Sequence, residues 1–410
     1  MTSAPAESPT YPTDLRSLAA ALVRIETENP PGNERECAEY VRDWFAQYDI
    51  DAELVTDPDP ERPQVGARVA PSEGETDAVE GDTDGPTLVL NGHLDVVPVG
   101  DHDEWTHPPY AGVVADGRLY GRGSVDMKTG VAIAMLTAYE LRAELESGAL
   151  DGSIVVHAAM GEETAEPGTR ALLEAGYDGD YGVVLEPTEC RVATSEKGMA
   201  WYELSWPGVP AHASRPDEGT NPTAHYPVVL DALAEYDARL RDRTDPLCGC
   251  AYATVTGTNA GVGSNKAVIP ERASVTVDRR ILPAETIDDV DDEFAALVDT
   301  LEREHGIAAS WRRDETYTSA VIPTDHHLAT VFREHAAAVA GVDPEPWGIK
   351  ASTDVREFVN VADVPAITWG PGSLDQAHSI DEYVDLDAAE AGFEILKRAA
   401  RTLLEPYPDD

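Results

Sequence analysis

The chain has few basic side chains. Its 410 residues include 30 lysines and arginines against 77 aspartates and glutamates, which gives a formal net charge of −47. This charge disfavours binding to nucleic acid or to an anionic membrane, since both would repel it. The acids are spread along the chain, which favours a solvated acidic surface over a cluster for cations or basic partners. High salt shortens the Debye length to about 3 Å at 1 M, so we expect the surface of a halophilic protein.

Cysteines are also scarce, at four: Cys37, Cys190, Cys248 and Cys250. None has the spacing of a zinc finger or of a redox motif. Cys248 and Cys250 flank a single glycine, which is too close for an ordinary disulfide. We therefore expect free thiols in a reducing compartment.

Long apolar runs are missing as well. No segment approaches the roughly 20 apolar residues that a membrane-spanning helix needs. Residues 1–12 lack both the basic region and the apolar region of a signal peptide. Together with the cysteines, this predicts a cytoplasmic protein without a membrane partner.

The apolar segments that are present are short and alternate with helices. A chain of 410 residues is too long for one typical core, so two domains are expected. Continuous apolar runs predict strands at 87–90, 154–159, 181–185 and 366–369. An amphipathic helix is predicted at 128–146. This alternation indicates an α/β fold with a mostly parallel sheet and helices on both faces. The polar segment 71–86 is predicted to be a mobile surface loop.

The middle of the chain has a different pattern. Strands are predicted at 201–206, 251–256, 273–279 and 308–312, and helices at 221–243 and 286–305. The order β-α-β-β-α-β is that of a ferredoxin-like α+β domain. It is inserted into the α/β domain, so the predicted boundaries are 1–196 and 314–410 for the α/β domain and 197–313 for the insertion.

Residues that suit metal binding follow each predicted strand of the α/β sheet. They are His93 and Asp95, Glu162 and Glu163, Glu186, and His378, with Asp126 just ahead of the long helix. Ligands of open α/β sheets lie beyond the carboxyl ends of the strands, so these residues are expected to converge. Imidazole and carboxylate donors suit zinc or cobalt, and a two-metal site needs one shared carboxylate. Asp95, two residues after His93, could orient that imidazole.

Five ordered motifs resemble the zinc-dependent amidohydrolase and exopeptidase family that includes acetylornithine deacetylase, succinyl-diaminopimelate desuccinylase, aminoacylase and glutamate carboxypeptidase. The motifs are Gly92–Pro98, Gly121–Lys128, Glu162–Glu163, Glu186–Thr188 and Ala377–Tyr383. The resemblance covers nearly the whole chain, including the inserted domain. It implies the zinc-exopeptidase fold and two divalent metal ions, zinc or cobalt.

The resemblance also implies roles for individual residues. One ion would be held by His93, Asp126 and Glu186, and the other by Asp126, Glu163 and His378. Asp126 would bridge the ions and precede a cis peptide bond, Asp95 would orient His93, and Glu162 would be the general base.

In the inserted domain, the resemblance implies a lid and a homodimer. His212, in the motif Ala211–Pro216, would stabilise the oxyanion from a neighbouring subunit. Asn265 and Arg280 would bind the carboxylate of the substrate. Arg280 is preferred to the adjacent Arg279 because of its spacing from Pro270. Arg356 either faces the substrate or is a salt-bridged surface arginine.

The predicted function is hydrolysis of the amide bond of an N-acyl amino acid. Glu186 stands where the aminopeptidases of the family have Asp, which favours a deacylase or a carboxypeptidase. A dipeptidase or carboxypeptidase acting on short peptides is the nearest alternative. A non-catalytic metal-binding protein on the same fold is a remote one, because all five ligands and the base are present.

Overall fold

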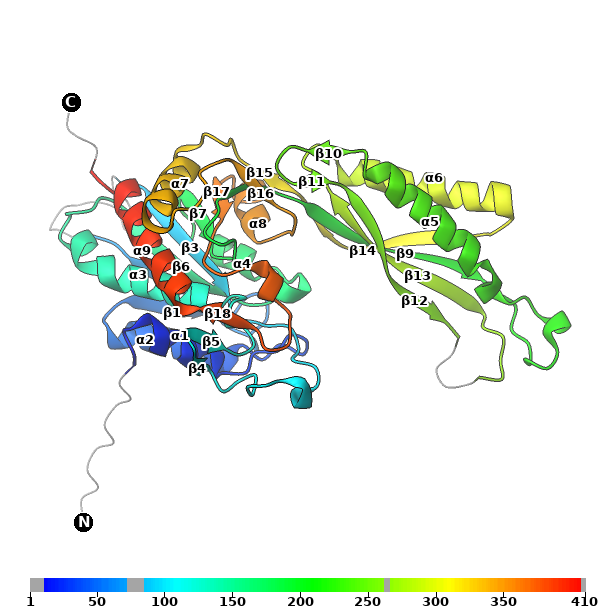
Figure 1. Cartoon of the computed structure of the whole chain (residues 1–410), viewed down its shortest axis with the longest axis horizontal. Helices are drawn as coiled ribbons and strands as arrows, with labels where there is room; N and C mark the ends of the chain where they lie inside the picture. The colour runs from blue at the N-terminus through cyan, green and yellow to red at the C-terminus, as the bar shows by residue number, and fades with distance from the viewer. Residues whose placement is uncertain (1–10, 72–84, 262–265, 407–410) are drawn as a thin grey trace, which may run out of the picture. The chain divides into compact units, whose positions relative to one another are not determined.

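The computed structural model describes residues 11–71, 85–261 and 266–406 (Figure 1). The chain divides into two compact units. Unit 1 contains Met1–Thr194, Ile322–Trp347 and Thr353–Asp410, and unit 2 contains Ser195–Val321 and Gly348–Ser352. The predicted domain boundaries were 196/197 and 313/314. Most of the predicted loop 71–86 lies outside the described residues, as does Asn265.

The centre of unit 1 is a parallel sheet. β3 (Thr87–His93) pairs in parallel with β6 (Ser153–Ala159) and with β7 (Tyr181–Val184), and β7 pairs in parallel with β17 (Ala366–Thr368). The flanking strands β1 (Asp51–Val55) and β2 (Gln64–Val69), beyond β6, are antiparallel, and so is β8 (Ala193–Glu196) where Ala193 pairs with Thr368 of β17. The predicted parallel core is confirmed, and β1 and β2 were not predicted.

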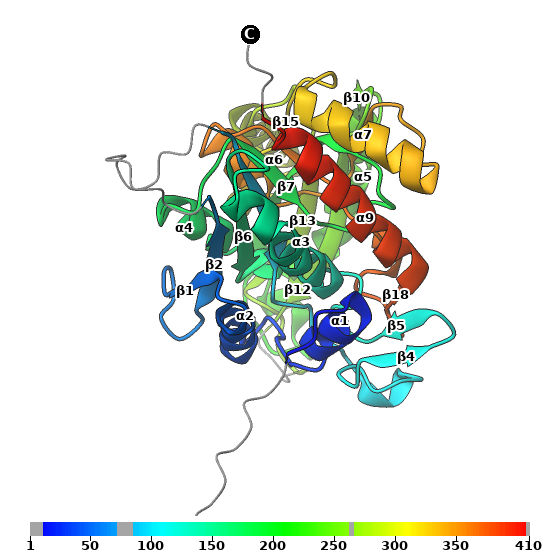
Figure 2. The ribbon, with the colours of Figure 1, turned by 90° about the vertical axis from the view of Figure 1, so that its left-hand side faces the viewer.

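Helices cover both faces of this sheet. Alternate residues of a strand face opposite sides. In β6, Val156 and Ala158 join the core that includes α3 (Lys128–Glu146), whereas the His157 ring stacks on Phe358 of α8 (Val355–Asn360). On the α3 face lie α1 (Leu15–Val23), α7 (His327–Ala340) and α9 (Leu386–Leu403) (Figure 2). α4 (Gly168–Glu174) packs on β6 and α8, and α2 (Arg35–Gln47) packs on β1 and β2.

A small sheet in unit 1 joins segments far apart in the chain. It consists of β4 (Val113–Ala115), β5 (Arg118–Tyr120) and β18 (Tyr383–Asp385), all antiparallel. Tyr383 pairs with Tyr120, which places the segment after β5 beside the segment before β18. Both segments carry predicted site residues, so this sheet helps to assemble the site.

Unit 2 is a four-stranded antiparallel sheet with two helices. Its elements are β9 (Gly198–Pro207), α5 (Tyr226–Leu240), β12 (Tyr252–Ala260), β13 (Arg272–Ile281), α6 (Ile287–His305) and β14 (Ser310–Tyr317). The strand order β12-β13-β9-β14 confirms the predicted ferredoxin-like arrangement. Two short strands, β10 (Thr244–Asp245) and β11 (Gly249–Cys250), form a separate pair.

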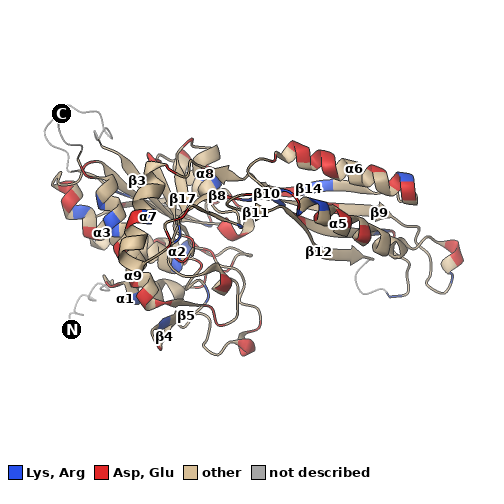
Figure 3. Ribbon diagram, turned by 45° about the horizontal axis from the view of Figure 1, so that its top comes forward, with Lys and Arg blue, Asp and Glu red and all other residues tan. Residues whose placement is uncertain are grey.

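Acidic side chains lie on helices of both units and gather along α6 (Figure 3). The helix begins with a capping box in which Thr286 and Asp289 satisfy each other's backbone N–H groups. Its buried stripe is Val290, Phe294, Leu297 and Leu301. Its exposed acids are Asp288, Asp289, Asp292, Asp299, Glu302 and Glu304.

The four cysteines are unpaired, as predicted, and Cys37, Cys190 and Cys248 are buried. Among the helices in the described ranges, none combines the length and apolar character needed to cross a membrane.

Candidate metal centre

The predicted metal ligands meet at the carboxyl edge of the parallel sheet in unit 1. His93 is the last residue of β3, Glu162 and Glu163 follow β6, and Glu186 follows β7. Asp126 lies two residues before α3, and its bond to Met127 is cis, as predicted. Because neighbouring parallel strands end at the same edge, these side chains converge.

The Asp126 carboxylate lies between two histidines. Its Oδ1 is 3.2 Å from Nε2 of His93, and its Oδ2 is 3.3 Å from Nε2 of His378. Each histidine also faces a glutamate: His93 Nε2 is 3.5 Å from Glu186 Oε1, and His378 Nε2 is 3.1 Å from Glu163 Oε2. One carboxylate is therefore shared by two separate donor sets.

These donor sets fit divalent metal ions. Two ligands that each lie about 2.1 Å from a tetrahedral ion are roughly 3.4 Å apart, close to the spacing of the donors here. Two groups that cut across these sets also have ligand atoms within 4.8 Å of one another: His93 with Asp126 and Glu163, and His93 with Glu162 and Glu186. In addition, Glu163 Oε1 is buried without a hydrogen-bond partner in the described part of the chain. A buried acceptor of this kind calls for a cation or another donor.

The electrostatics of the centre favour a bound cation. Hydrogen bonds to Asp126 and Glu163 raise the pKa of His378 to about 10. Burial alone would lower the pKa of His93, but contacts with Asp126, Asp95 and Glu186 raise it well above its usual value. Since a ligating imidazole must be neutral, an ion that binds here displaces protons, and its affinity falls as the pH falls.

The pKa values of two glutamates in the centre are raised above the usual value of a carboxyl group. Burial, followed by repulsion from Asp126, raises the pKa of Glu186 to about 7. Burial also raises the pKa of Glu162 well above its usual value. A carboxylate with a raised pKa holds a transferred proton well, which suits a general base.

Asp95 contacts His93 through both its backbone and its side chain. His93 Nδ1 donates to the backbone carbonyl of Asp95 at 2.8 Å, and the Asp95 carboxylate is 3.6 Å from the same nitrogen. That buried carboxylate also accepts the backbone N–H groups of Glu162 and Glu163, both at 3.1 Å, and Nδ2 of Asn29 at 3.0 Å. Asp95 thus fixes the turn that carries the base and one ligand. Asn29 was not predicted, and its only sequence signal is its place in the break Asn29–Gly32.

We expect Asp95→Asn to reduce turnover by about 10–100-fold, in the range seen when partners of metal ligands are removed. The amide keeps one acceptor oxygen, but its NH₂ must face an N–H of the turn, so the turn loosens. Steady-state kinetics and metal content check this. Asp299→Asn, on the exposed face of α6, is the control. Unchanged turnover and metal content would show that the turn holds without the carboxylate.

Two of the predicted substrate-binding residues, His212 and Arg280, belong to unit 2. His212 is exposed, and its Nδ1 is 2.7 Å from Ser214 Oγ. Arg280 has a 31% exposed side chain paired with Asp278, whereas Arg279 is fully buried against Tyr236 and Glu285. Only Arg280 of this adjacent pair reaches solvent.

Arg356 belongs to unit 1 and is buried, with a side chain only 4% exposed. Its guanidinium is 3.0 Å from Asp354 and donates to the carbonyl of Thr353 at 2.6 Å. It is therefore paired within the fold and is not a surface arginine. Asn265 is not among the described residues.

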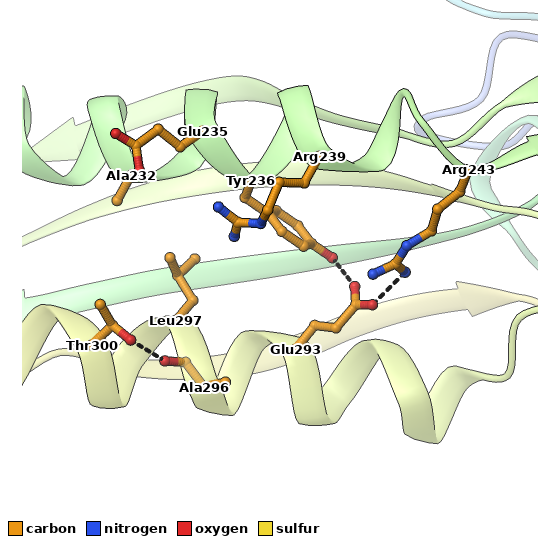
Figure 4. A pocket seen from close by; sticks show the side chains of 9 residues that line it. All are labelled: Ala232, Glu235, Tyr236, Arg239, Arg243, Glu293, Ala296, Leu297 and Thr300. Carbon is orange, nitrogen blue, oxygen red and sulfur yellow. Dashed lines mark hydrogen bonds and ion pairs between the residues drawn. The ribbon is translucent and has the colours of Figure 1, made fainter.

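Unit 2 also contains a hollow of about 250 Å³ between α5 and α6 (Figure 4). Glu293 on its wall accepts from the Tyr236 hydroxyl at 2.5 Å and pairs with Arg243. Its carboxylate is thus satisfied by cationic and hydroxyl donors, which makes the hollow a poor metal site.

The geometry of unit 1, with a shared carboxylate at the edge of a parallel sheet, defines a metal-dependent hydrolase, and comparison with known proteins agrees. Residues 89–402 match peptidase family M20/M25/M40, and the chain belongs to that family. It is similar to a protein of Staphylococcus epidermidis described as a probable succinyl-diaminopimelate desuccinylase. That relative is 28% identical, with 96% of this chain and 98% of the relative covered.

Solved structures with low sequence identity share the fold. One is an M20 metallo-carboxypeptidase from Sulfolobus solfataricus, with a TM-score of 0.74, 16% identity, and coverage of 94% of this chain and 98% of the other. Another is a tripeptidase from Staphylococcus aureus, with a TM-score of 0.72, 17% identity, and coverage of 96% and 98%.

Proposed function

We propose that the protein hydrolyses the amide bond of an N-acyl amino acid with two divalent metal ions. The observation that carries this proposal is the Asp126 carboxylate, whose two oxygens lie 3.2 and 3.3 Å from the imidazoles of His93 and His378. A two-metal hydrolase needs such a shared carboxylate with separate ligands on either side.

The residues divide into two ligand sets. His93, Asp126 and Glu186 would hold one ion, and Asp126, Glu163 and His378 the other, zinc or cobalt in each case. Bound ions of this kind lower the pKa of water and polarise a carbonyl oxygen. Glu162, on the turn held by Asp95, would take the proton from the attacking water and deliver it to the departing amine nitrogen.

Unit 2 would supply the contacts that select the substrate. His212 would donate to the oxyanion that forms on the carbonyl. Arg280, the exposed member of its pair, would bind the substrate carboxylate with its planar guanidinium. Asn265 and Arg356 remain predicted substrate contacts, as does the homodimer through which His212 would act.

Two observations bear on the choice between deacylation and peptide hydrolysis. Glu186, the residue typical of deacylases and carboxypeptidases at its position, argues against an aminopeptidase and does not separate those two. The relative described as a probable desuccinylase, which aligns over nearly the whole of both chains, favours deacylation. The peptidase alternative is favoured by the structural similarity to a carboxypeptidase and a tripeptidase, which extends to the fold alone.

The conditions for an assay follow from the charge. With a formal net charge of −47, self-repulsion destabilises the compact state at low ionic strength. We propose that the protein works in a salt-rich cytoplasm, so the assay is run in molar salt.

A substrate panel tests the proposal. Purified protein with zinc or cobalt is given N-acetylornithine, N-succinyl-diaminopimelate, several N-acetyl amino acids and several dipeptides. We expect turnover of an acyl amino acid that a chelator abolishes and added metal restores. Turnover of dipeptides alone would favour the peptidase alternative. Protein that binds two ions but hydrolyses none of these amides would contradict the proposal.

A further inference from the structure

Glu382 is a buried glutamate outside the two ligand sets, and it accepts hydrogen bonds from several backbone N–H groups. Its side chain is 1% exposed. Oε1 accepts from the N–H groups of Val125 at 2.9 Å and Asp126 at 3.2 Å, and Oε2 accepts from that of Gly123 at 3.1 Å. Its backbone carbonyl accepts from Gly121 N–H at 3.0 Å. One residue therefore binds most of the turn that presents Asp126.

Arg122 extends this contact to the segment that carries His378. Its Nη1 donates to Glu382 Oε2 at 2.8 Å and to the carbonyl of Ser379 at 3.1 Å. The arginine side chain is only 4% exposed. Hydrogen bonds in which both partners are charged are shorter and stronger than neutral ones. The pair thus ties the residue after His378 to the turn before Asp126.

The local fold explains why the two segments meet here. The turn follows β5, Glu382 precedes β18, and these strands pair through Tyr120 and Tyr383. The turn is tight: Gly123 has a φ of 80°, and a Cβ there would lie 2.7 Å from Val96 Cγ1. The N–H groups of so tight a turn cannot all pair within it, and Glu382 satisfies them.

We propose that Glu382 is a positioning residue that, with Arg122, sets the distance between the Asp126 carboxylate and His378. This rests on the proposed function, in which those two side chains share an ion. The other histidine, His93, is fixed independently by β3 and by the carbonyl of Asp95. Loss of the Glu382 contacts should therefore weaken the ion held by Asp126, Glu163 and His378 more than the ion held by His93, Asp126 and Glu186.

Glu382→Gln is the sharpest variant because it changes little in size. The glutamine keeps one acceptor oxygen, while its NH₂ group must face either Gly123 N–H and Arg122 or the N–H groups of Val125 and Asp126. In either orientation the NH₂ group faces another hydrogen-bond donor, so the turn must shift. Glu285→Gln in unit 2 is a matched control, since Glu285 also pairs with a buried arginine, Arg279, and accepts a backbone N–H, from Leu282.

The test is titration of metal-depleted protein with Co²⁺, followed by calorimetry and by visible absorption, alongside thermal unfolding without metal. For Glu382→Gln we expect the ion held by Asp126, Glu163 and His378 to lose about 10–100-fold in affinity, and the ion held by His93, Asp126 and Glu186 to change less than about threefold. Excess Co²⁺ should restore most of kcat, because Glu382 does not touch the reacting atoms. Glu285→Gln should leave both affinities unchanged.

Other outcomes overturn the inference. Equal loss of both ions together with a lower unfolding temperature would assign Glu382 a purely structural role, and unchanged affinities would remove it from the site. If Glu382→Gln does not fold, Arg122→Lys is used; it keeps the charge but loses the link to Ser379, and the same unequal loss is expected. An unmodified protein that binds fewer than two ions would refute the proposed function instead.

Discussion

Replacement of Glu162 by Gln is expected to reduce kcat by about 10²–10⁴-fold, the usual contribution of a general base, while both metal ions stay bound. The carboxylate that accepts the proton is lost, but the turn on which it lies remains held by Asp95. That turn is fixed through the backbone N–H groups of residues 162 and 163, which the substitution leaves in place. Steady-state kinetics and metal analysis of the purified variant provide the measurement.

The adjacent residue provides a matched contrast. Glu163→Gln changes the same chemical group one position along the chain, where the carboxylate faces His378 at 3.1 Å. There we expect loss of one ion as well as loss of turnover. If Glu162→Gln kept its activity, or lost metal as Glu163→Gln should, Glu162 would not be the base.

Replacement of Asp126 by Ala is expected to have the larger effect, because it removes a ligand from both sets at once. Neither ion should then bind tightly, and turnover should fall to background. A ligand that binds only the folded state adds RT ln(1 + [L]/Kd), about 2.7 kcal/mol at 100 times Kd, to the free energy of unfolding. Added zinc or cobalt should therefore raise the unfolding temperature of the parent protein but not that of Asp126→Ala.

His378→Ala provides the comparison, because His378 belongs to one ligand set whereas Asp126 belongs to both. It should lose one ion and keep the other, so metal should still raise its unfolding temperature, by less than in the parent. If Asp126→Ala also kept one tightly bound ion, Asp126 would belong to a single set and the two-metal arrangement would fail.

Continuous apolar runs made the core of unit 1 predictable. The predicted helix 128–146 coincides with α3, and the predicted strand 154–159 is one residue shorter than β6. The candidate ligands could be predicted because His93, Glu163, Glu186 and His378 come after such strands and Asp126 lies just ahead of the predicted helix. β4, β5 and β18, each of three residues, were not predicted. β1 and β2 were missed as well, and both are antiparallel strands at the side of the sheet.

The contacts around the ligands could not be predicted as well from the sequence. Asp95 lies two residues from His93, so orientation of that ring was expected, yet its carboxylate binds a turn some 67 residues further along the chain. Asn29 and Glu382 act through backbone N–H groups or a second side chain, which leave no spacing pattern. Likewise, spacing favoured Arg280 over Arg279, but only the paired strands show which one is buried.

The order of strands in the sheet of unit 1 has a consequence for synthesis of the protein. β17 pairs with β7, although the whole of unit 2 is translated between them. Until β17 emerges from the ribosome, β7 presents an open, apolar edge, the kind of surface that promotes aggregation. His378 follows β17, so the second donor set also forms only near the end of translation. The nascent chain must remain soluble through that interval, and its dense negative charge gives it a means of doing so.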